Sequence, residues 1–185
     1  IAETRLYSAL ELEGRDIYIR EGCYVCHSQM IRPFGPETQR YGDASALSDS
    51  RFDHPFQWGS KRNGPDLARV GGKYNNSWHF VHMRDPRAVS SGSNMPTFPW
   101  LYEARTDVAA LPRKIEVQRM LGVPFPVMTP AEIERSVAVQ AAAITKDLRE
   151  QGNLIESDRE IVALIAYLQQ LGKYETVKPR TAANP

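Results

Sequence analysis

The sequence contains few cysteines and no long apolar run. Only two of its 185 residues are cysteine, so a site that needs a second cysteine pair cannot be built from this chain. No stretch approaches the roughly 18 to 20 apolar residues that a membrane-spanning helix needs, and the best run covers only residues 161–166. The formal net charge of +1 argues against nucleic acid or an anionic membrane surface as the main partner. The length suits one domain with elaborations.

The two cysteines belong to one short motif. Cys23 and Cys26 are separated by two residues, and His27 follows directly. This Cys-x-x-Cys-His pattern is typical of covalent haem attachment. On one helical turn two thiols face the same way, so both can add to the vinyl groups of a haem, while the histidine becomes an axial ligand of the iron. We therefore predict one covalently bound haem c at these three residues.

Three other uses of a cysteine pair fit less well. A zinc site needs four ligands, and only His79 and His82 remain to complete it. A thioredoxin-like redox pair belongs to a βαβ pattern, which the surrounding sequence lacks. A disulfide between Cys23 and Cys26 would close too small a loop to stabilise the chain much. Haem attachment is favoured over all three.

Met95 is the best candidate for the second axial ligand. Haems of this kind that carry electrons usually have a methionine sulfur opposite the histidine. Met95 stands in a loop bounded by Gly92 and two prolines, which suits a ligand presented at a fixed depth, although a methionine that only fills the core is the common alternative. The other methionines lie too close to His27, in helical patterns or near a helix cap: Met30, Met83, Met120 and Met128.

Helical patterns lie at both ends of the chain. A capping box, Ser8 followed by Glu11, predicts a first helix directly before the cysteine motif. Another box, Ser157 followed by Glu160, predicts a last helix that Gly172 ends. We expect the last helix to pack across the first, near the haem.

The middle of the chain is less regular. Residues 28–60 contain several prolines, glycines and scattered aromatics, which favours an ordered loop packed on the cofactor or on a partner. Asn76 is expected to cap a short helix over residues 77–84. A further short helix is expected over 112–121, and a capping box formed by Thr129 and Glu132 predicts a helix to about residue 150. His54 is expected to be a surface or structural histidine, and His79 and His82 are expected to face a partner or solvent.

These elements predict one domain. It covers residues 1–172, with insertions at about 28–60 and 102–155, and is followed by a tail over 173–185. The polar end of this tail, residues 178–185, is expected to be frayed.

Two continuous stretches resemble a known family. Residues 21–33 (Glu-Gly-Cys-Tyr-Val-Cys-His-Ser-Gln-Met-Ile-Arg-Pro) and residues 53–62 (Asp-His-Pro-Phe-Gln-Trp-Gly-Ser-Lys-Arg) are similar to the mono-haem cytochrome c subunit of cbb₃-type haem–copper oxidases, the CcoO or FixO family. The likeness covers most of residues 8–101 and returns at 157–172. It implies a mainly α fold, a class I cytochrome c-like helical domain around one covalent haem, with long loops and an inserted helix.

The resemblance also implies the roles of the site residues. Cys23 and Cys26 would form the thioether bonds, and His27 and Met95 would be the axial ligands. Pro65, which follows a glycine, would accept a hydrogen bond from the histidine Nδ1 through its backbone carbonyl, and this fixes the ring and its tautomer.

Charged and aromatic side chains are candidates to hold the haem propionates. They are Arg69, Lys61, Arg62, Trp58 and Trp100, for which a solvated charge or a place in the core is the alternative.

The family resemblance implies an electron-transfer subunit without a catalytic site of its own. Such a subunit relays electrons from a donor cytochrome c or a tri-haem cytochrome c subunit to the catalytic haem–copper subunit, where oxygen is reduced. The family carries an N-terminal membrane helix that is absent from this chain. The resemblance therefore places the protein on the periplasmic side of the bacterial inner membrane, and no nucleic acid is expected among its partners.

Three alternatives stay open at this point. Two are also electron carriers: a free periplasmic cytochrome c, and the cytochrome c subunit of a nitric oxide reductase. The third is a haem enzyme or sensor with an open sixth position, in which Met95 is only structural. Carbon monoxide binding by the ferrous protein separates the third from the others, because a closed His/Met site does not bind it readily.

Overall fold

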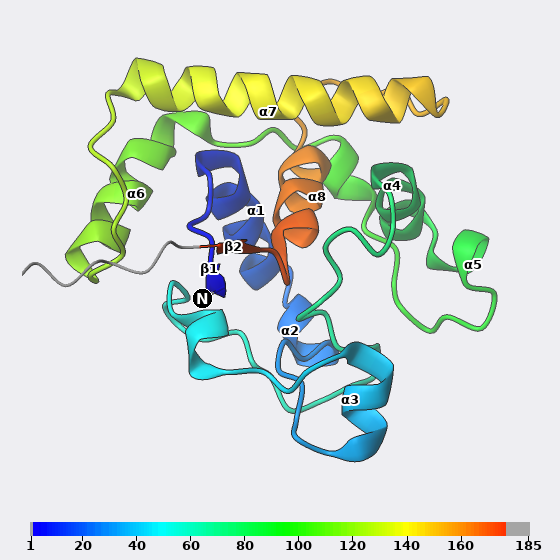
Figure 1. Ribbon diagram of the computed structural model, residues 1–185. Coiled ribbons are helices and arrows are strands. Elements are labelled where there is room, and N and C mark those ends of the chain that lie inside the picture. The colour runs from blue at the N-terminus through cyan, green and yellow to red at the C-terminus, as the bar shows by residue number, and fades with distance from the viewer. Residues whose placement is uncertain (1, 177–185) are drawn as a thin grey trace, which may run out of the picture.

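The computed structural model describes residues 2–176, and two crossed helices form its centre (Figure 1). Helix α1 (Ala9–Arg20) meets α8 (Glu160–Gln170) at Gly14, where an added Cβ would lie 1.9 Å from the carbonyl oxygen of Ala163. Only glycine allows so close an approach of the two backbones. The α8 side chains from residue 161 to 168 are all buried, so this helix is the core of the protein. The predicted packing of the last helix on the first is confirmed.

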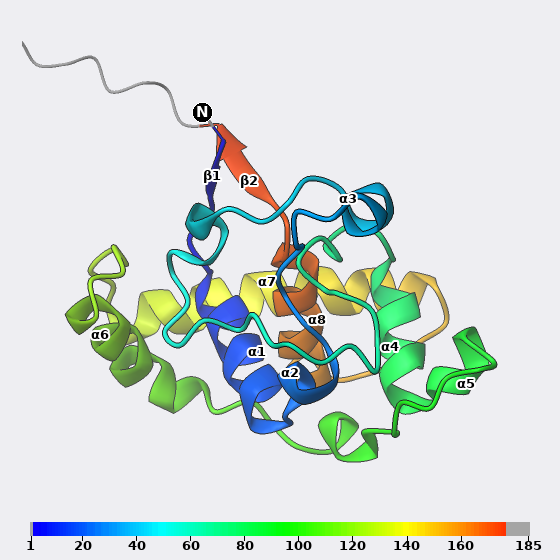
Figure 2. The same cartoon turned by 90° about the horizontal axis from the view of Figure 1, so that it is seen from below.

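The remaining elements surround this pair. The long helix α7 (Pro130–Glu150) runs along one side of it, and the single turn α2 (Cys23–Cys26) lies on the opposite side (Figures 1 and 2). Helices α4 (Asn76–Arg84) and α5 (Pro86–Val89) lie on one flank, and α6 (Leu111–Met120) lies on the other. The mainly helical fold predicted from the sequence is therefore confirmed.

Short elements complete the chain. Helix α3 (Gly35–Tyr41) and three 3₁₀ turns, η1 (Leu47–Ser50), η2 (Pro99–Tyr102) and η3 (Val108–Ala110), lie in the connections. Strands β1 (Ala2–Thr4) and β2 (Tyr174–Thr176) pair antiparallel and bring the two ends of the described chain together. Within residues 2–176, no helix is both long and apolar enough to cross a bilayer.

Two of the three predicted capping boxes are present. Ser8 and Glu11 exchange both hydrogen bonds at the start of α1, and Thr129 and Glu132 do the same for α7. The box predicted at Ser157 is wrong, because α8 begins after Arg159 without a side-chain cap. The physical reason is that other residues bind both groups of Glu160 that the box needs.

The carboxylate of Glu160 is taken by Arg20, whose Nη1 lies 2.8 Å from Oε1. The backbone amide of Glu160 donates to the Ala104 carbonyl at 3.1 Å. Neither group is left for a box with Ser157.

Three smaller expectations also need correction. The residue that caps α4 is Asn75 and not Asn76, because the Asn75 side chain accepts from the Trp78 amide at 2.8 Å. The stretch predicted as an irregular loop over 28–60 contains α3, which Pro36 can begin because its missing N–H has no partner in a first helical turn. The predicted tail contains β2, which pairs with β1. The frayed end expected at 178–185 lies outside the described residues.

Candidate haem site

The cysteine motif forms one turn of helix at the end of α1. Gly22 has φ +70°, in the left-handed region that glycine adopts easily, and it separates α1 from α2. Cys23 and Cys26 lie on this turn as free, half-buried thiols. Burial, together with the Glu21 carboxylate, raises the pKa of Cys23 to about 12, so this group is a neutral thiol at physiological pH. Two thiols on one turn are what attachment to two vinyl groups requires.

His27 is held by the segment that follows residue 60. Its Nδ1 lies 2.8 Å from the Pro65 carbonyl oxygen, and the Gly64 amide donates to the Cys26 carbonyl at 3.0 Å. A carbonyl can only accept, so Nδ1 carries the proton and Nε2 keeps its lone pair. Burial lowers the pKa of His27, while the Pro65 carbonyl acts in the opposite direction. The contact predicted for Pro65 is present.

Gly64 provides the space for the His27 ring. An added Cβ at this position would lie 2.2 Å from Cε1 of His27, 2.7 Å from Nδ1 and 2.8 Å from Nε2. All three distances are far below van der Waals contact, so no residue with a side chain fits here without moving the imidazole. The ring therefore lies against bare backbone on this side.

A buried polar network beside the motif was not predicted. Ser28 donates to Asp66 at 2.6 Å, and Arg62 Nε donates to the Ser28 hydroxyl at 2.6 Å. Asp66 also accepts from the Met30 amide at 2.9 Å, and Leu67 N–H donates to the Ser28 carbonyl at 2.8 Å. This network joins the residues after His27 to the segment that carries Pro65. Its members are far apart in sequence and have no common spacing that would have revealed them.

A second unpredicted contact holds the segment over residues 53–59. Asp53 is buried and accepts from Arg15 Nε of α1 at 2.7 Å and from Tyr7 OH at 3.0 Å. Arg15 Nη2 also donates to the Pro55 carbonyl at 2.9 Å. Further along, the Trp58 carbonyl accepts from the amide of Gln29 at 2.7 Å. The segment therefore lies across the motif, fixed at both ends.

The outer surface of this segment is aromatic. Phe56 stacks on Trp58 with 4.7 Å between the ring centroids and is half exposed. Gly59 lies close to the motif, since a Cβ there would be 3.0 Å from the Tyr24 carbonyl oxygen. Tyr24 and Val25, between the two cysteines, are also exposed.

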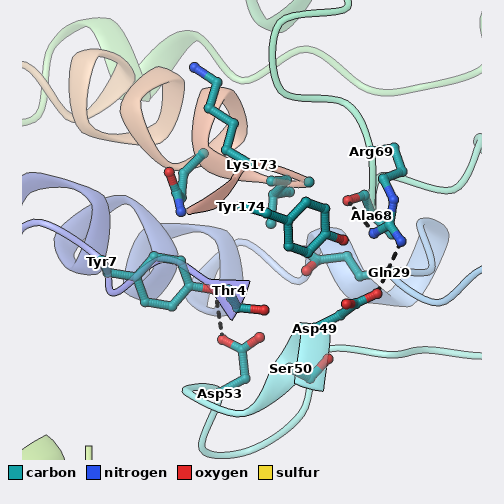
Figure 3. Close-up of a pocket in the computed structure, with 13 residues that line it drawn as sticks. Thr4, Tyr7, Gln29, Asp49, Ser50, Asp53, Ala68, Arg69, Lys173 and Tyr174 are labelled. Atoms are coloured by element: carbon teal, nitrogen blue, oxygen red, sulfur yellow. Dashed lines mark hydrogen bonds and ion pairs between the residues drawn. The ribbon is translucent and has the colours of Figure 1, made fainter. Parts of the chain in front are cut away.

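Arg69 is bound to a carboxylate of the protein itself. Figure 3 shows it beside Asp49, and its Nη2 lies 3.0 Å from Oδ2 of that carboxylate. Its guanidinium also stacks over the Tyr174 ring, at 5.1 Å from the centroid. It lines a cavity of about 30 Å³ together with Gln29 and Asp53. Arg69 therefore has a protein partner, and its predicted role at the propionates stays a prediction.

Three of the other propionate candidates also have hydrogen-bond partners within the protein. Trp58 donates to Ser50, Arg62 belongs to the Ser28 network, and Trp100 donates to Glu21 at 2.9 Å. Lys61 is exposed.

The loop with Met95 is attached to α4. Phe98 N–H donates to the Met83 carbonyl at 2.9 Å, and Arg87 Nη1 lies 3.4 Å from the Met95 carbonyl oxygen. The Met95 side chain is half buried and packs against the hydrophobic core. Its role as the axial ligand stays a prediction.

The remaining histidines differ in burial: His54 and His82 are half buried, whereas His79 is 2% exposed. The expectation that His79 faces a partner or solvent is therefore wrong, because its ring packs inside the protein, edge-on to Tyr74. Among the described residues, no group of three or more His, Cys, Asp or Glu side chains is placed to hold a metal ion, so His79 and His82 do not complete a zinc site with the cysteines.

The residues of the site fit a haem. Two free thiols lie on one turn, the imidazole of His27 has Nε2 available, and the missing side chain of Gly64 leaves room for that ring, which together form a consistent proximal face. On α4, the ring nitrogen Nδ1 of His82 is buried and has no partner among the described residues.

Comparison with known proteins agrees with this geometry. A family model described as cytochrome c oxidase, mono-heme subunit/FixO, matches residues 1–174. A search of curated proteins found no match for the chain.

Proposed function

Because the chain belongs to the FixO family of mono-haem cytochrome c oxidase subunits, we propose that it relays electrons within a cbb₃-type oxidase. The electrons would come from a donor cytochrome c or a tri-haem cytochrome c subunit and would pass to the catalytic haem–copper subunit. The observation that carries the proposal is the hydrogen bond from His27 to Pro65 beside two free thiols on one turn. This arrangement presents a single orientated imidazole, which suits a permanent axial ligand.

The side chains of the motif would hold the haem covalently. Cys23 and Cys26 would hold it through thioether bonds, for which each thiol would give its sulfur to one carbon of a vinyl group and its proton to the other. The haem supplies reversible one-electron chemistry at its iron. His27 would bind through Nε2, and the hydrogen bond from Nδ1 to Pro65 makes the imidazole a better electron donor.

Met95 would supply the second ligand of the haem iron. With His27 and Met95 both bound, the iron would keep its ligands on electron transfer, and little rearrangement would oppose it. A neutral sulfur ligand favours the ferrous state. A closed site of this kind has no place for oxygen, and reduction of oxygen would take place in the catalytic subunit.

We place the domain on the periplasmic side of the bacterial inner membrane. Covalent haem attachment through two cysteines takes place outside the bacterial cytoplasm, which supports this location.

The deciding experiment is gentle detergent extraction of native membranes, followed by purification through this protein. Haem type, copper and oxygen uptake driven by reduced cytochrome c would then be measured. Recovery with b-type haem, copper and oxygen uptake would support the oxidase subunit. Recovery with b-type haem and non-haem iron would replace it by a nitric oxide reductase, and recovery alone with one covalent haem would leave a free electron carrier.

A further inference from the structure

Backbone hydrogen bonds join the two segments that meet at the contact between His27 and Pro65. On one side of the contact the Leu67 amide donates to the Ser28 carbonyl at 2.8 Å, and on the other side the Gly64 amide donates at 3.0 Å. The two segments therefore lie side by side at the ring. The distance of 2.8 Å from Nδ1 to the Pro65 carbonyl oxygen depends on how firmly they are held together.

The side chain of Asp66 makes a further connection between the same two segments. Its Oδ2 accepts from the Ser28 hydroxyl at 2.6 Å and from the Met30 amide at 2.9 Å, both on the segment that follows His27. Its Oδ1 accepts from the Ala68 amide at 2.8 Å, on its own segment. The Asp66 side chain is 0% exposed, so these hydrogen bonds are shielded from solvent.

Each member of the Ser28–Asp66 pair stands next to one partner of the ring contact. Asp66 follows Pro65 in the chain, and Ser28 follows His27. Arg62 supports the pair, because its Nε donates to the Ser28 hydroxyl at 2.6 Å and its Nη2 lies 3.4 Å from Oδ2 of Asp66. The position of the carbonyl against the ring is therefore fixed by this side-chain pair as well as by the backbone.

Asp66 also brings a carboxylate to this side of the imidazole. Burial lowers the pKa of His27, and the Pro65 carbonyl and then the Asp66 carboxylate raise it. A firm hydrogen bond from Nδ1–H and a nearby negative charge both make Nε2 a stronger electron donor. A stronger donor stabilises ferric iron more than ferrous iron, which lowers the reduction potential.

We propose that Asp66 is a positioning residue for the haem ligand His27, and that it lowers the reduction potential of the haem by holding the Pro65 carbonyl against Nδ1–H. Asp66 acts through Pro65 and His27. The proposal rests on the proposed function only in that His27 binds the iron of a covalently attached haem. It depends neither on the identity of the second axial ligand nor on the complex that the chain joins.

The first test is the reduction potential of the Asp66→Asn holoprotein. The variant keeps the shape of the side chain, but its NH₂ group cannot accept a hydrogen bond where a carboxylate oxygen did. The equilibrium with a reference electron carrier should shift about three- to tenfold towards the ferrous form, and a tenfold shift equals about 59 mV. An unchanged or lowered potential would overturn the proposal.

Glu37→Gln is the matched control. Glu37 is a second buried carboxylate that binds the same guanidinium, with 2.8 Å between its Oε2 and Nη2 of Arg62. No hydrogen bond joins Glu37 to Ser28 or Asp66 within the described part of the chain. The variant removes the same charge as Asp66→Asn and should leave the potential nearly unchanged. An equal shift in both variants would overturn the proposal, because the loss of charge and not the position of Asp66 would then be responsible.

A milder variant covers the case in which Asp66→Asn does not fold. Ser28→Ala removes one hydrogen bond of Asp66 and leaves its contact with Arg62. In the ferrous, diamagnetic holoprotein labelled with ¹⁵N, the Nδ1 proton of His27 should then resonate upfield of its wild-type position and exchange faster with water, because its hydrogen bond to Pro65 is looser. A merely structural role would lower the melting temperature and leave this proton unchanged, which would refute the role of Asp66.

Failure of this inference and failure of the proposed function give different results. A wild-type protein that carries no covalent haem at the cysteine motif would refute both. A haem protein in which neither the potential nor the Nδ1 proton of His27 responds to the changes at Asp66 and Ser28 would refute only the positioning role.

Discussion

The Gly64→Ala variant tests the proximal side of the site most directly. Its Cβ would lie 2.2 Å from Cε1 of His27, and it would be nearly as close to both ring nitrogens. Gly64 does not have a positive φ, so alanine has no intrinsic difficulty with the backbone conformation. The whole cost comes from the imidazole, which must leave its place and lengthen its bond to the Pro65 carbonyl.

The overlap of the added Cβ with the His27 ring sets the size of the loss in stability. Forcing one methyl group into a filled site costs about 1 to 3 kcal/mol, and a contact this short belongs at the upper end. For a chain of this size, about 3 kcal/mol lowers the melting temperature by about 6 to 12 °C. In the holoprotein the displaced ring should also bind iron less well, and we expect high-spin ferric haem to appear.

Thermal melting and the visible spectrum of the holoprotein measure both effects. Gly35→Ala is the matched control, because nothing lies within 4 Å of a Cβ at Gly35, and it should melt at or slightly above the wild-type temperature. The reasoning fails if Gly64→Ala melts like the control and keeps a purely low-spin spectrum.

Three further variants test the axial ligand, the helix crossing and the effect of pH. Met95→Ala should open the sixth position, so that the ferrous holoprotein binds carbon monoxide readily; an unchanged ferric spectrum and potential would show that Met95 is not the ligand. Gly14→Ala would bring a Cβ to 1.9 Å from a backbone carbonyl, and urea unfolding should show a loss of about 3 kcal/mol or more, whereas a smaller loss would mean that α1 and α8 can separate easily. Burial holds the pKa of His79 at about 4, below the usual 6.5 of an unfolded histidine, so the unfolded chain binds more protons between these values and stability falls as the pH drops from about 6.5 to 4, by about 3 kcal/mol in total. Urea unfolding at neutral and acidic pH should show most of this loss removed in His79→Phe, and an equal loss in that variant would place the acid sensitivity elsewhere.

Sequence reasoning succeeded where the signal was local. The capping boxes at Ser8 and Thr129 depend on residues three positions apart, and both are present. The box at Ser157 has the same local pattern and failed, because Arg20, 140 residues away from Glu160, binds the carboxylate that the box needs. A local pattern predicts a cap only when no distant partner competes for its members.

The candidate site shows the same difference between local sequence signals and contacts of distant residues. The motif at Cys23 and the contact of Pro65 with His27 follow from fixed spacing and from the family resemblance. For Arg69, the sequence shows a positive charge but not the carboxylate that the side chain meets; in the fold it meets Asp49. Such tertiary pairing is not visible in the sequence, and the role of Arg69 at the propionates stays a prediction.

The segment over residues 53–59 is held in place by a buried ion pair. Arg15 and Asp53 are both buried, and such a pair is weak evidence for stability, because removing both charges from water costs about as much as their attraction returns. What the pair does achieve is position, since Arg15 also holds the Pro55 carbonyl and so fixes where the segment crosses the cysteine motif. Replacing only one partner would leave an uncompensated buried charge, so the two must change together. This coupling, together with the stack of Phe56 on Trp58 at the outer surface, restricts the residues that the segment can accept.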